Sequence, residues 1–203
     1  HENAQFLTFL CAVVEAVDEY QDLLRISVAT AGNDHRLGAN EAPPAIISMF
    51  LGEELTGILE AIENDTACDV KEKELFKVGV HALPRFPKDT TDRNRTSPFA
   101  FTGNKFEFRM VGSSDSIADA NTTLNAIVAE SFCEAADELE GSTDFTADAN
   151  RVIAENLRKH SRVIFNGNGY TEEWVAEAEK RGLYNLASTP DCLPQILAEK
   201  NVE

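Results

Sequence analysis

Apolar residues return at helical spacing through much of the chain. In residues 3–20 they recur every three or four positions, at Phe6, Phe9, Leu10, Val13, Val14 and Val17. This spacing predicts a strongly amphipathic helix, because three or four residues make one helical turn. Weaker versions of the same pattern predict further helices at residues 21–30, 53–63, 117–139, 148–160, 171–181 and 189–200.

Details of the later helices also follow from the pattern. In the long helix at 117–139 we expect five side chains to face inward: Leu124, Ile127, Val128, Phe132 and Cys133. Thr171 and Thr189 are expected N-caps, since a threonine hydroxyl can accept a hydrogen bond from a free amide of the first turn. Pro190 would then occupy the first helical position, where proline is favoured.

Strands are predicted in the middle of the chain. Residues 45–50 form a short apolar run that is typical of a buried strand. Residues 95–101 and 105–111 are separated by Thr102-Gly-Asn104, which indicates a β-hairpin. A further strand at 76–81 lies in an otherwise polar stretch that resembles an insertion.

These elements predict an α+β fold with two parts. Residues 1–111 would hold a few antiparallel strands, with an insertion at about 53–92, and residues 112–203 would form a helical C-terminal part. The stretch 31–44 is expected to be a loop, because it combines two glycines and two prolines with polar residues. The chain opens already within a helical pattern and without Met, so we expect it to be a segment of a longer protein.

Composition narrows the possible partners. The formal charge is −17, which argues against nucleic-acid binding, since such proteins usually carry a basic face. The longest apolar run, residues 42–51, is too short for a membrane span. The four cysteines are far apart in the sequence, and we expect Cys11 and Cys133 to be buried free thiols. Free thiols favour a cytoplasmic location.

The sign of the local charge is inverted between Arg85 and Arg109, where the sequence contains six basic and three acidic residues. Within this stretch, Lys105-Phe-Glu-Phe-Arg109 alternates charged and aromatic residues. A strand would place Phe106 and Phe108 on one face and Lys105, Glu107 and Arg109 together on the other. That charged face is either a solvated ion-pair surface or an anion site in which Glu107 binds a divalent metal.

A second candidate feature is the loop at 33–44, which carries Arg36 and Glu41. Glycine and proline spacing would let this loop close over a site. A mobile glutamate could then attract an ammonium ion and take its proton. His35 is weaker evidence, because an exposed loop histidine is commoner than a catalytic one.

The motifs together resemble a known family. Arg36-Leu-Gly-Ala-Asn-Glu-Ala-Pro-Pro44 is similar to the flap motif of glutamine synthetases, Asn94-Arg-Thr-Ser97 to their Asn-Arg-Ser segment, and Lys105-Phe-Glu-Phe-Arg109 to their Arg-Ile-Glu-Val-Arg strand. The three occur in the family's order, and with residues 166–174 they resemble the long type III enzymes. The chain is similar to the C-terminal portion of that catalytic domain over essentially its whole length.

The resemblance implies roles for the basic residues. Arg36 and Arg109 would bind the substrate glutamate, and Arg109 would also lie near the transferred phosphoryl group. Arg95 would neutralise that phosphoryl and contact ATP. Lys105 takes the place of a family arginine near ATP. Position 100 departs from the family, because an alanine stands there in place of a second arginine.

The resemblance also implies roles for two acidic residues. Glu107 would ligate Mg²⁺ or Mn²⁺, and Glu41 would be the flap glutamate that shields the intermediate and deprotonates ammonium. The catalytic set would therefore be Glu41, Arg95 and Arg109. The implied reaction is ATP-dependent ligation of ammonia to glutamate through γ-glutamyl phosphate.

Family members are ring-shaped homo-oligomers whose other metal ligands precede this region, so we expect the isolated chain to be inactive. Two alternatives remain open from the residues. One is a related ATP-dependent ligase that joins glutamate to another amine. The other is a non-catalytic assembly module, which would be favoured if Glu107 and Arg109 simply pair with each other and face no cavity. A synthetase site instead predicts that Arg36, Arg95, Glu107 and Arg109 converge within one pocket.

Overall fold

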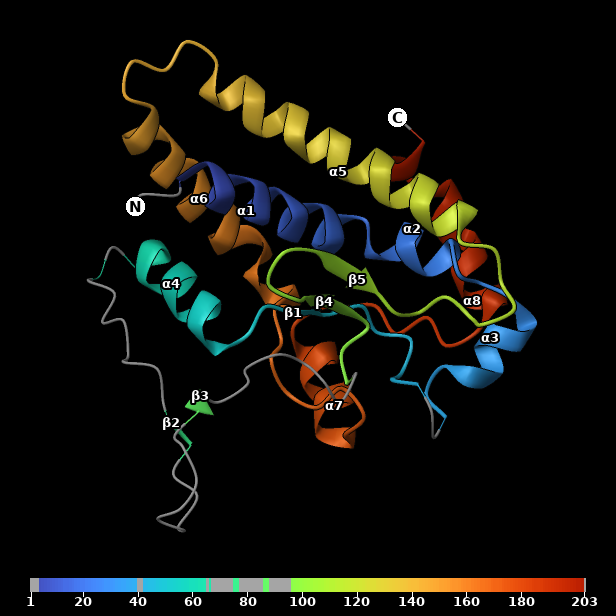
Figure 1. The fold of residues 1–203 in the computed structure, drawn as a ribbon. Coiled ribbons are helices and arrows are strands. Elements are labelled where there is room, and N and C mark those ends of the chain that lie inside the picture. Colours follow the sequence, from blue (N-terminus) through green and yellow to red (C-terminus); the bar gives the residue numbers. More distant parts are fainter. Residues whose placement is uncertain are drawn as a thin grey trace.

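The computed structural model describes residues 4–39, 42–64, 66, 75–76, 86–87 and 96–202 (Figure 1). The helices in chain order are α1 (Ala4–Glu19), α2 (Gln21–Ile26), α3 (Ala31–Arg36), α4 (Glu53–Glu63), α5 (Ala118–Leu139), α6 (Phe145–His160), α7 (Glu172–Lys180) and α8 (Thr189–Cys192). The strands are β1 (Met49–Phe50), β2 (Leu75–Phe76), β3 (Phe86–Pro87), β4 (Phe99–Phe101) and β5 (Phe106–Phe108).

Helix α1 is the centre of the helical layer and packs against both α5 and α6 (Figure 1). Its predicted apolar stripe is buried, with Val14 and Val17 fully enclosed. Burial of this stripe is the main stabilising contribution of the helix, since each enclosed valine contributes roughly 1.5–3 kcal/mol. The core formed on α1 continues into residues of β1, β4 and α6, so the two predicted parts of the chain share one core. The boundary between residues 111 and 112 stays a prediction.

The sheet is mixed, which corrects the expectation of antiparallel strands alone. β4 and β5 form the predicted antiparallel hairpin, with Ala100 opposite Glu107. β1, however, runs parallel to β4, with Met49 opposite Phe99. The chain reaches β4 from β1 through a long connection that includes α4, which allows the parallel arrangement. In the predicted strand at 45–50 only Met49–Phe50 is regular, although Ala45, Ile46 and Ile47 are buried as expected.

The insertion at about 53–92 is only partly described. Its first element, α4, has the predicted bounds. β2 and β3 form a short antiparallel pair with Phe76 opposite Phe86. The strand expected at 76–81 therefore starts at Leu75, and its remainder lies outside the described residues.

The loop predicted at 31–44, with the flap at 33–44, begins instead as helix α3. Thr30 caps it, because the threonine hydroxyl accepts a hydrogen bond from the Asn33 amide over 3.1 Å. A Cβ atom added at Gly32 would contact nothing within 4 Å, so packing does not require glycine at this position. The glycines and prolines of residues 31–44 favoured a loop, so the sequence did not indicate this helix cap. The real loop starts at Gly38, whose positive φ of 80° favours glycine.

Helix α5 is more exposed than its sequence indicates. Ile127 is buried, but Cys133 is exposed and Phe132 is 37% exposed, contrary to the predicted inward face. The reason is that α5 lies on the outer side of the helical layer, where it packs mainly against α1 and makes fewer contacts with α6 and α2 (Figure 1). Phe132 packs against Phe9 of α1, with the two rings tilted by 42° and their centroids 5.2 Å apart. Cys11 is buried as predicted.

The predicted helix at 189–200 is broken. α8 spans only Thr189–Cys192, and two 3-10 turns, η2 (Leu193–Leu197) and η3 (Glu199–Asn201), follow it. Its N-cap is Ser188 and not Thr189, because Asp191 accepts hydrogen bonds from both the amide and the hydroxyl of Ser188. Pro194 contributes no amide hydrogen and so prevents a regular helix from continuing. The prediction of Thr171 as N-cap of α7 is confirmed by its hydrogen bond from the Trp174 amide.

The loop between η1 (Ser161–Val163) and α7 joins the C-terminal helices to the strand region. The Asn166 side-chain oxygen accepts hydrogen bonds from the amides of Leu51 and Gly52 at 3.1 and 2.9 Å. Gly169 lies against the backbone of another segment: a Cβ atom there would come within 2.5 Å of the Thr96 carbonyl oxygen and 3.7 Å of Pro43. The close approach therefore requires glycine at this position.

None of the helices in the described part of the chain combines the length and apolar character needed to cross a membrane.

Candidate functional site

The charged face of β5 has the arrangement that strand alternation predicts. The Lys105 Nζ lies 3.4 Å from one oxygen of Glu107, and the Arg109 guanidinium donates to the other oxygen from Nη2 at 2.9 Å and from Nε at 3.2 Å. Phe106 and Phe108 point the opposite way and contact Phe99. The face therefore presents cation, carboxylate and cation side by side.

The surroundings of Glu107 keep it ionised. The hydrogen bond from Arg109 is the largest influence, and with Lys105 it holds the pKa of the Glu107 carboxyl below its ordinary value. The Glu107 side chain is 37% exposed, so it remains accessible to a ligand. An ionised, accessible carboxylate is a hard oxygen donor of the kind that Mg²⁺ and Mn²⁺ prefer. Glu107 fits as one metal ligand, but a single carboxylate does not complete a coordination shell.

Arg36, at the end of α3, lies beside the end of β5. Its Nη2 donates to the carbonyl oxygen of Met110 at 2.7 Å, and its Nε donates to the side-chain oxygen of Asn33 at 2.9 Å. Met110 directly follows Arg109, so Arg36 is held against the backbone next to Arg109, although the sequence separates the two arginines by more than seventy positions. Nη1 of Arg36 has no hydrogen-bond partner among the described residues.

The base of the predicted flap is closed by a backbone hydrogen bond of 2.9 Å from the Gly38 amide to the Pro43 carbonyl oxygen. Ala42 is buried, so the chain is anchored in the core where the loop ends. Glu41 and Arg95 lie outside the described residues. The predicted meeting of Arg36, Arg95, Glu107 and Arg109 in one pocket therefore stays a prediction.

A cavity of about 270 Å³ lies between α1, α4 and the hairpin turn. Its lining is mostly apolar, including Phe6, Leu55 and Phe101. The four described site residues, Arg36, Lys105, Glu107 and Arg109, do not line it, so the charged face is separate from this hollow.

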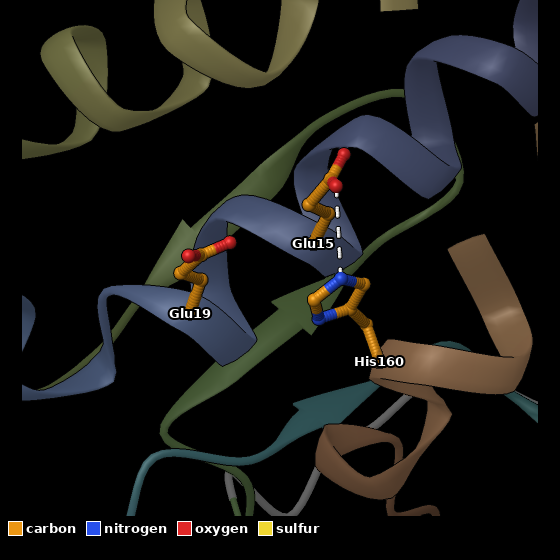
Figure 2. Close-up of side chains that lie close together, drawn as sticks. All are labelled: Glu15, Glu19 and His160. Atoms are coloured by element: carbon orange, nitrogen blue, oxygen red, sulfur yellow. Dashed lines mark ion pairs between the residues drawn. The ribbon is translucent and has the colours of Figure 1, made fainter. Parts of the chain in front are cut away.

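Another cluster of possible metal ligands lies between α1 and α6, and the sequence did not point to it. Glu15, Glu19 and His160 each place a ligand atom within 4.8 Å of the others, and Figure 2 shows the two glutamates one turn apart on α1, facing the histidine. The two glutamates share a helical face, but His160 is more than 140 residues away, so no local motif indicates it.

Contacts with two carboxylates account for the position of His160 in this cluster. The His160 Nδ1 lies 3.0 Å from Asp18, and its Nε2 lies 3.6 Å from Glu15. Asp18 is almost fully buried and also accepts a hydrogen bond from Arg162 at 2.8 Å. These contacts engage both ring nitrogens and tie the end of α6 to α1. Burial, the largest cause, raises the pKa of Glu15 above its ordinary value, although His160 opposes the shift.

Comparison with known proteins supports the family resemblance. The family model "Glutamine synthetase C-terminal domain" matches residues 148–203. A type-3 glutamine synthetase of Dictyostelium discoideum is 52% identical over the whole chain, and a glutamine synthetase of Butyrivibrio fibrisolvens is 47% identical over the whole chain. A glutamine synthetase of Bacteroides fragilis is 45% identical over 94% of the chain.

The chain spans only 27–29% of the length of these relatives. Identity near one half over the full chain, with the family's flap and strand motifs in place, confirms the resemblance predicted from the sequence. The α+β fold, with a strand hairpin followed by helices, agrees with it. The chain therefore belongs to the glutamine synthetase family and corresponds to a segment of a type III sequence.

Proposed function

We propose that this chain supplies the glutamate-binding and phosphoryl-stabilising side of a glutamine synthetase active site. The reaction is the ATP-dependent ligation of ammonia to glutamate. The observation that carries the proposal is the charged face of β5, with Glu107 between two cations, in a chain 52% identical throughout to a type-3 glutamine synthetase. The substrates are glutamate, ammonia and ATP.

The reaction has two steps. An oxygen of the γ-carboxylate of glutamate attacks the γ-phosphorus of ATP, and the bond to ADP breaks. Ammonia then attacks the acyl carbon of γ-glutamyl phosphate, and inorganic phosphate leaves with the electron pair of the broken C–O bond. Both steps gather negative charge at one place, so fixed positive groups provide most of the stabilisation.

The basic residues divide this work. Arg36 binds the substrate carboxylate, because its Nη1 is left to donate while its other nitrogens are held by the protein. Arg109 contacts glutamate and the transferred phosphoryl from the neighbouring strand position. Arg95 neutralises charge on that phosphoryl, and Lys105 contacts ATP at the exposed end of the same face.

Glu107 contributes one oxygen to a bound Mg²⁺ or Mn²⁺, whose charge offsets that of the phosphates. Glu41 acts from the flap, where it takes a proton from ammonium and helps to exclude water from the acyl phosphate. The hydrogen bond between Gly38 and Pro43 fixes the base of this flap.

The remaining metal ligands come from the rest of a longer chain, and the enzyme assembles as a cytoplasmic homo-oligomeric ring. One carboxylate cannot hold the metal alone, so residues 1–203 by themselves are expected to form no glutamine. Glutamine formation by the isolated chain, with ATP and glutamate present, contradicts this expectation.

The test of the proposed function is Glu107→Ala in the full-length enzyme, with Glu140→Ala on the exposed end of α5 as the control. We expect Glu107→Ala to lower glutamine formation at least ~100-fold, the usual scale for one electrostatic group, and to raise the Mg²⁺ concentration needed for half activity. Near-normal turnover in Glu107→Ala contradicts the assignment.

One observation favours a second candidate function, a non-catalytic assembly module: Glu107 already pairs with Lys105 and Arg109. Under that alternative, Glu107→Ala changes the oligomeric state measured by light scattering and leaves the metal requirement of the full-length enzyme unchanged.

A further inference from the structure

Asn33 occupies the junction between α3 and the end of β5, and neither the motifs nor the comparisons assign it a role. It is 2% exposed. Its side-chain nitrogen donates to the carbonyl oxygens of Val28 and Met110, both at 2.8 Å. Its side-chain oxygen accepts a hydrogen bond from the Nε of Arg36 at 2.9 Å. One small amide thus connects three segments of the chain.

The amide of Asn33 has only one workable orientation. Both hydrogens of its nitrogen face carbonyl oxygens, and its oxygen faces a guanidinium N–H. The reversed orientation would set an oxygen against two carbonyls and an N–H against another N–H. The hydrogen-bond network therefore fixes the direction in which Arg36 is held.

Contacts other than the Asn33 side chain also hold α3 in place. The N-cap of α3 uses the backbone amide of Asn33 and the hydroxyl of Thr30. Asp34 separately anchors the helix, because it accepts hydrogen bonds from Arg25 and from the Thr189 amide, each at 2.6 Å. Loss of the Asn33 amide therefore leaves α3 attached at two other points.

Arg36 and Met110 are linked to Asn33 in a closed triangle. The Met110 carbonyl accepts from both Asn33 and Arg36, at 2.8 and 2.7 Å. Because Met110 follows Arg109, this triangle sets the position of Arg36 relative to the strand that carries Arg109. Holding a long arginine side chain in place before the substrate arrives lowers the entropy lost on binding.

We propose that Asn33 is a positioning residue for glutamate binding, which acts by holding Arg36 against the end of β5. This inference rests on the proposed function, because it takes Arg36 to be a ligand of the glutamate carboxylate. Asn33 itself does not touch substrate. Its effect on binding must therefore pass through the guanidinium of Arg36.

The test is a double-mutant cycle in the full-length enzyme with Asn33→Ala, Arg36→Ala and the double variant. KM and kcat are measured for glutamate and for ATP. We expect Asn33→Ala to raise the KM for glutamate ~10-fold, the scale of a lost hydrogen bond to a charged group, and to change the KM for ATP less than ~2-fold. In the Arg36→Ala background the Asn33 substitution should add no further loss.

The matched control is Asn156→Ala. Asn156 is also buried and donates its side-chain amide to Glu15 at 2.9 Å, but it lies on α6. It should leave the KM for glutamate unchanged. If Asn33→Ala does not yield folded enzyme, Asn33→Ser, whose hydroxyl keeps a donor for a backbone carbonyl oxygen, is carried through the same cycle.

Each outcome decides the matter. If the losses from Asn33 and Arg36 multiply in the double variant, or if the KM values for glutamate and ATP rise equally, Asn33 acts structurally and the inference is wrong while the proposed function stands. If Arg36→Ala leaves the KM for glutamate unchanged, the proposed role of Arg36 fails, and the role of Asn33 fails with it.

Discussion

The molecule contains two places where carboxylates and cations meet, and they differ in almost every physical respect. On the hairpin face, Glu107 lies between Lys105 and Arg109, and its pKa is lowered. Between α1 and α6, Glu15 lies half-buried beside His160, and its pKa is raised. The first place keeps a charge available to a ligand, whereas the second closes its charges within the protein.

The comparison shows why a cluster of titratable residues is not by itself a site. At the α1–α6 contact every ring nitrogen of His160 already faces a carboxylate, and Asp18 is buried with Arg162 as its partner. On the hairpin the groups are partly exposed, and the Lys105 side chain is 65% exposed. Exposure and an excess of cations, rather than proximity alone, are what the proposed binding of an anionic substrate at the hairpin requires.

An arginine-to-lysine substitution can be made both on the hairpin face and at the α1–α6 contact, and the hairpin variant should have the largest effect. Arg109→Lys loses the two-nitrogen contact with Glu107, so we expect kcat/KM for glutamate to fall ~100-fold in the full-length enzyme. Arg162→Lys weakens the contact with buried Asp18, so it should lower the free energy of unfolding by about 1–2 kcal/mol and leave kcat/KM unchanged. Steady-state kinetics and thermal unfolding measure the two effects.

If both lysine variants lower activity to a similar degree, the proposed difference between the hairpin face and the α1–α6 contact is wrong. Assays are made well below the unfolding temperature of either variant, so that a stability loss at Arg162 does not appear as lost activity.

A smaller effect concerns the pH dependence of stability, and it should have opposite signs in the two places. The folded-state pKa of Glu107 lies below the ordinary value of 4.5, so this residue stabilises the fold above pH 4.5 and the contribution is lost as pH falls. The folded-state pKa of Glu15 lies above 4.5, so the folded state binds the extra proton, and stability falls as pH rises above that value.

Glu107→Gln and Glu15→Gln test these signs through the difference in unfolding temperature between variant and wild type, measured from pH 3 to pH 7. The difference should become less favourable for Glu107→Gln, and more favourable for Glu15→Gln, as pH rises. A parallel trend in the two variants contradicts the opposed pKa shifts.

The smallest expected effect concerns the acidic face of α5 beside the second cluster. Burial, followed by the charges of Glu19 and Glu130, raises the pKa of Glu134. Glu134→Gln relieves this repulsion and should stabilise the fold by a few tenths of a kcal/mol. Glu172→Gln, in the first turn of α7, is the control of opposite sign, because a carboxylate is favourable at a helix N-terminus. Thermal unfolding at low salt measures both variants, and destabilisation by Glu134→Gln contradicts the expectation.

Local patterns predicted those parts of the fold that local forces determine. The apolar stripe of α1 and the alternation around Glu107 were both visible in the sequence, because helix and strand periodicities impose them. The cap at Thr30 was missed because Gly32 and the later prolines dominate the composition of that stretch. The exposed Cys133 was missed because a helical stripe does not reveal how much of it a neighbour covers.

The sequence indicated which residue types belong to the candidate site. It did not indicate the hydrogen bonds that hold them in place. Family motifs indicated Arg36, Glu107 and Arg109, but nothing local links Asn33 to Met110, which lies 77 positions later. The same applies to His160 and Asp18, which are 142 positions apart. Hydrogen bonds between such distant residues arise from the packing of whole elements, and one sequence does not encode them as a spacing.

The close contact at Gly169 has a practical meaning for protein engineering. Its backbone lies against Thr96, the residue after Arg95, and near Pro43 at the foot of the flap. The C-terminal segment therefore cannot be exchanged without regard to its contacts with the rest of the chain. In a chimera that exchanges residues 166–203 between relatives, we expect the contacts with Thr96 and Pro43 to survive only if the incoming loop brings glycine at this position. Gly169→Ala, which adds one methyl group, tests this requirement.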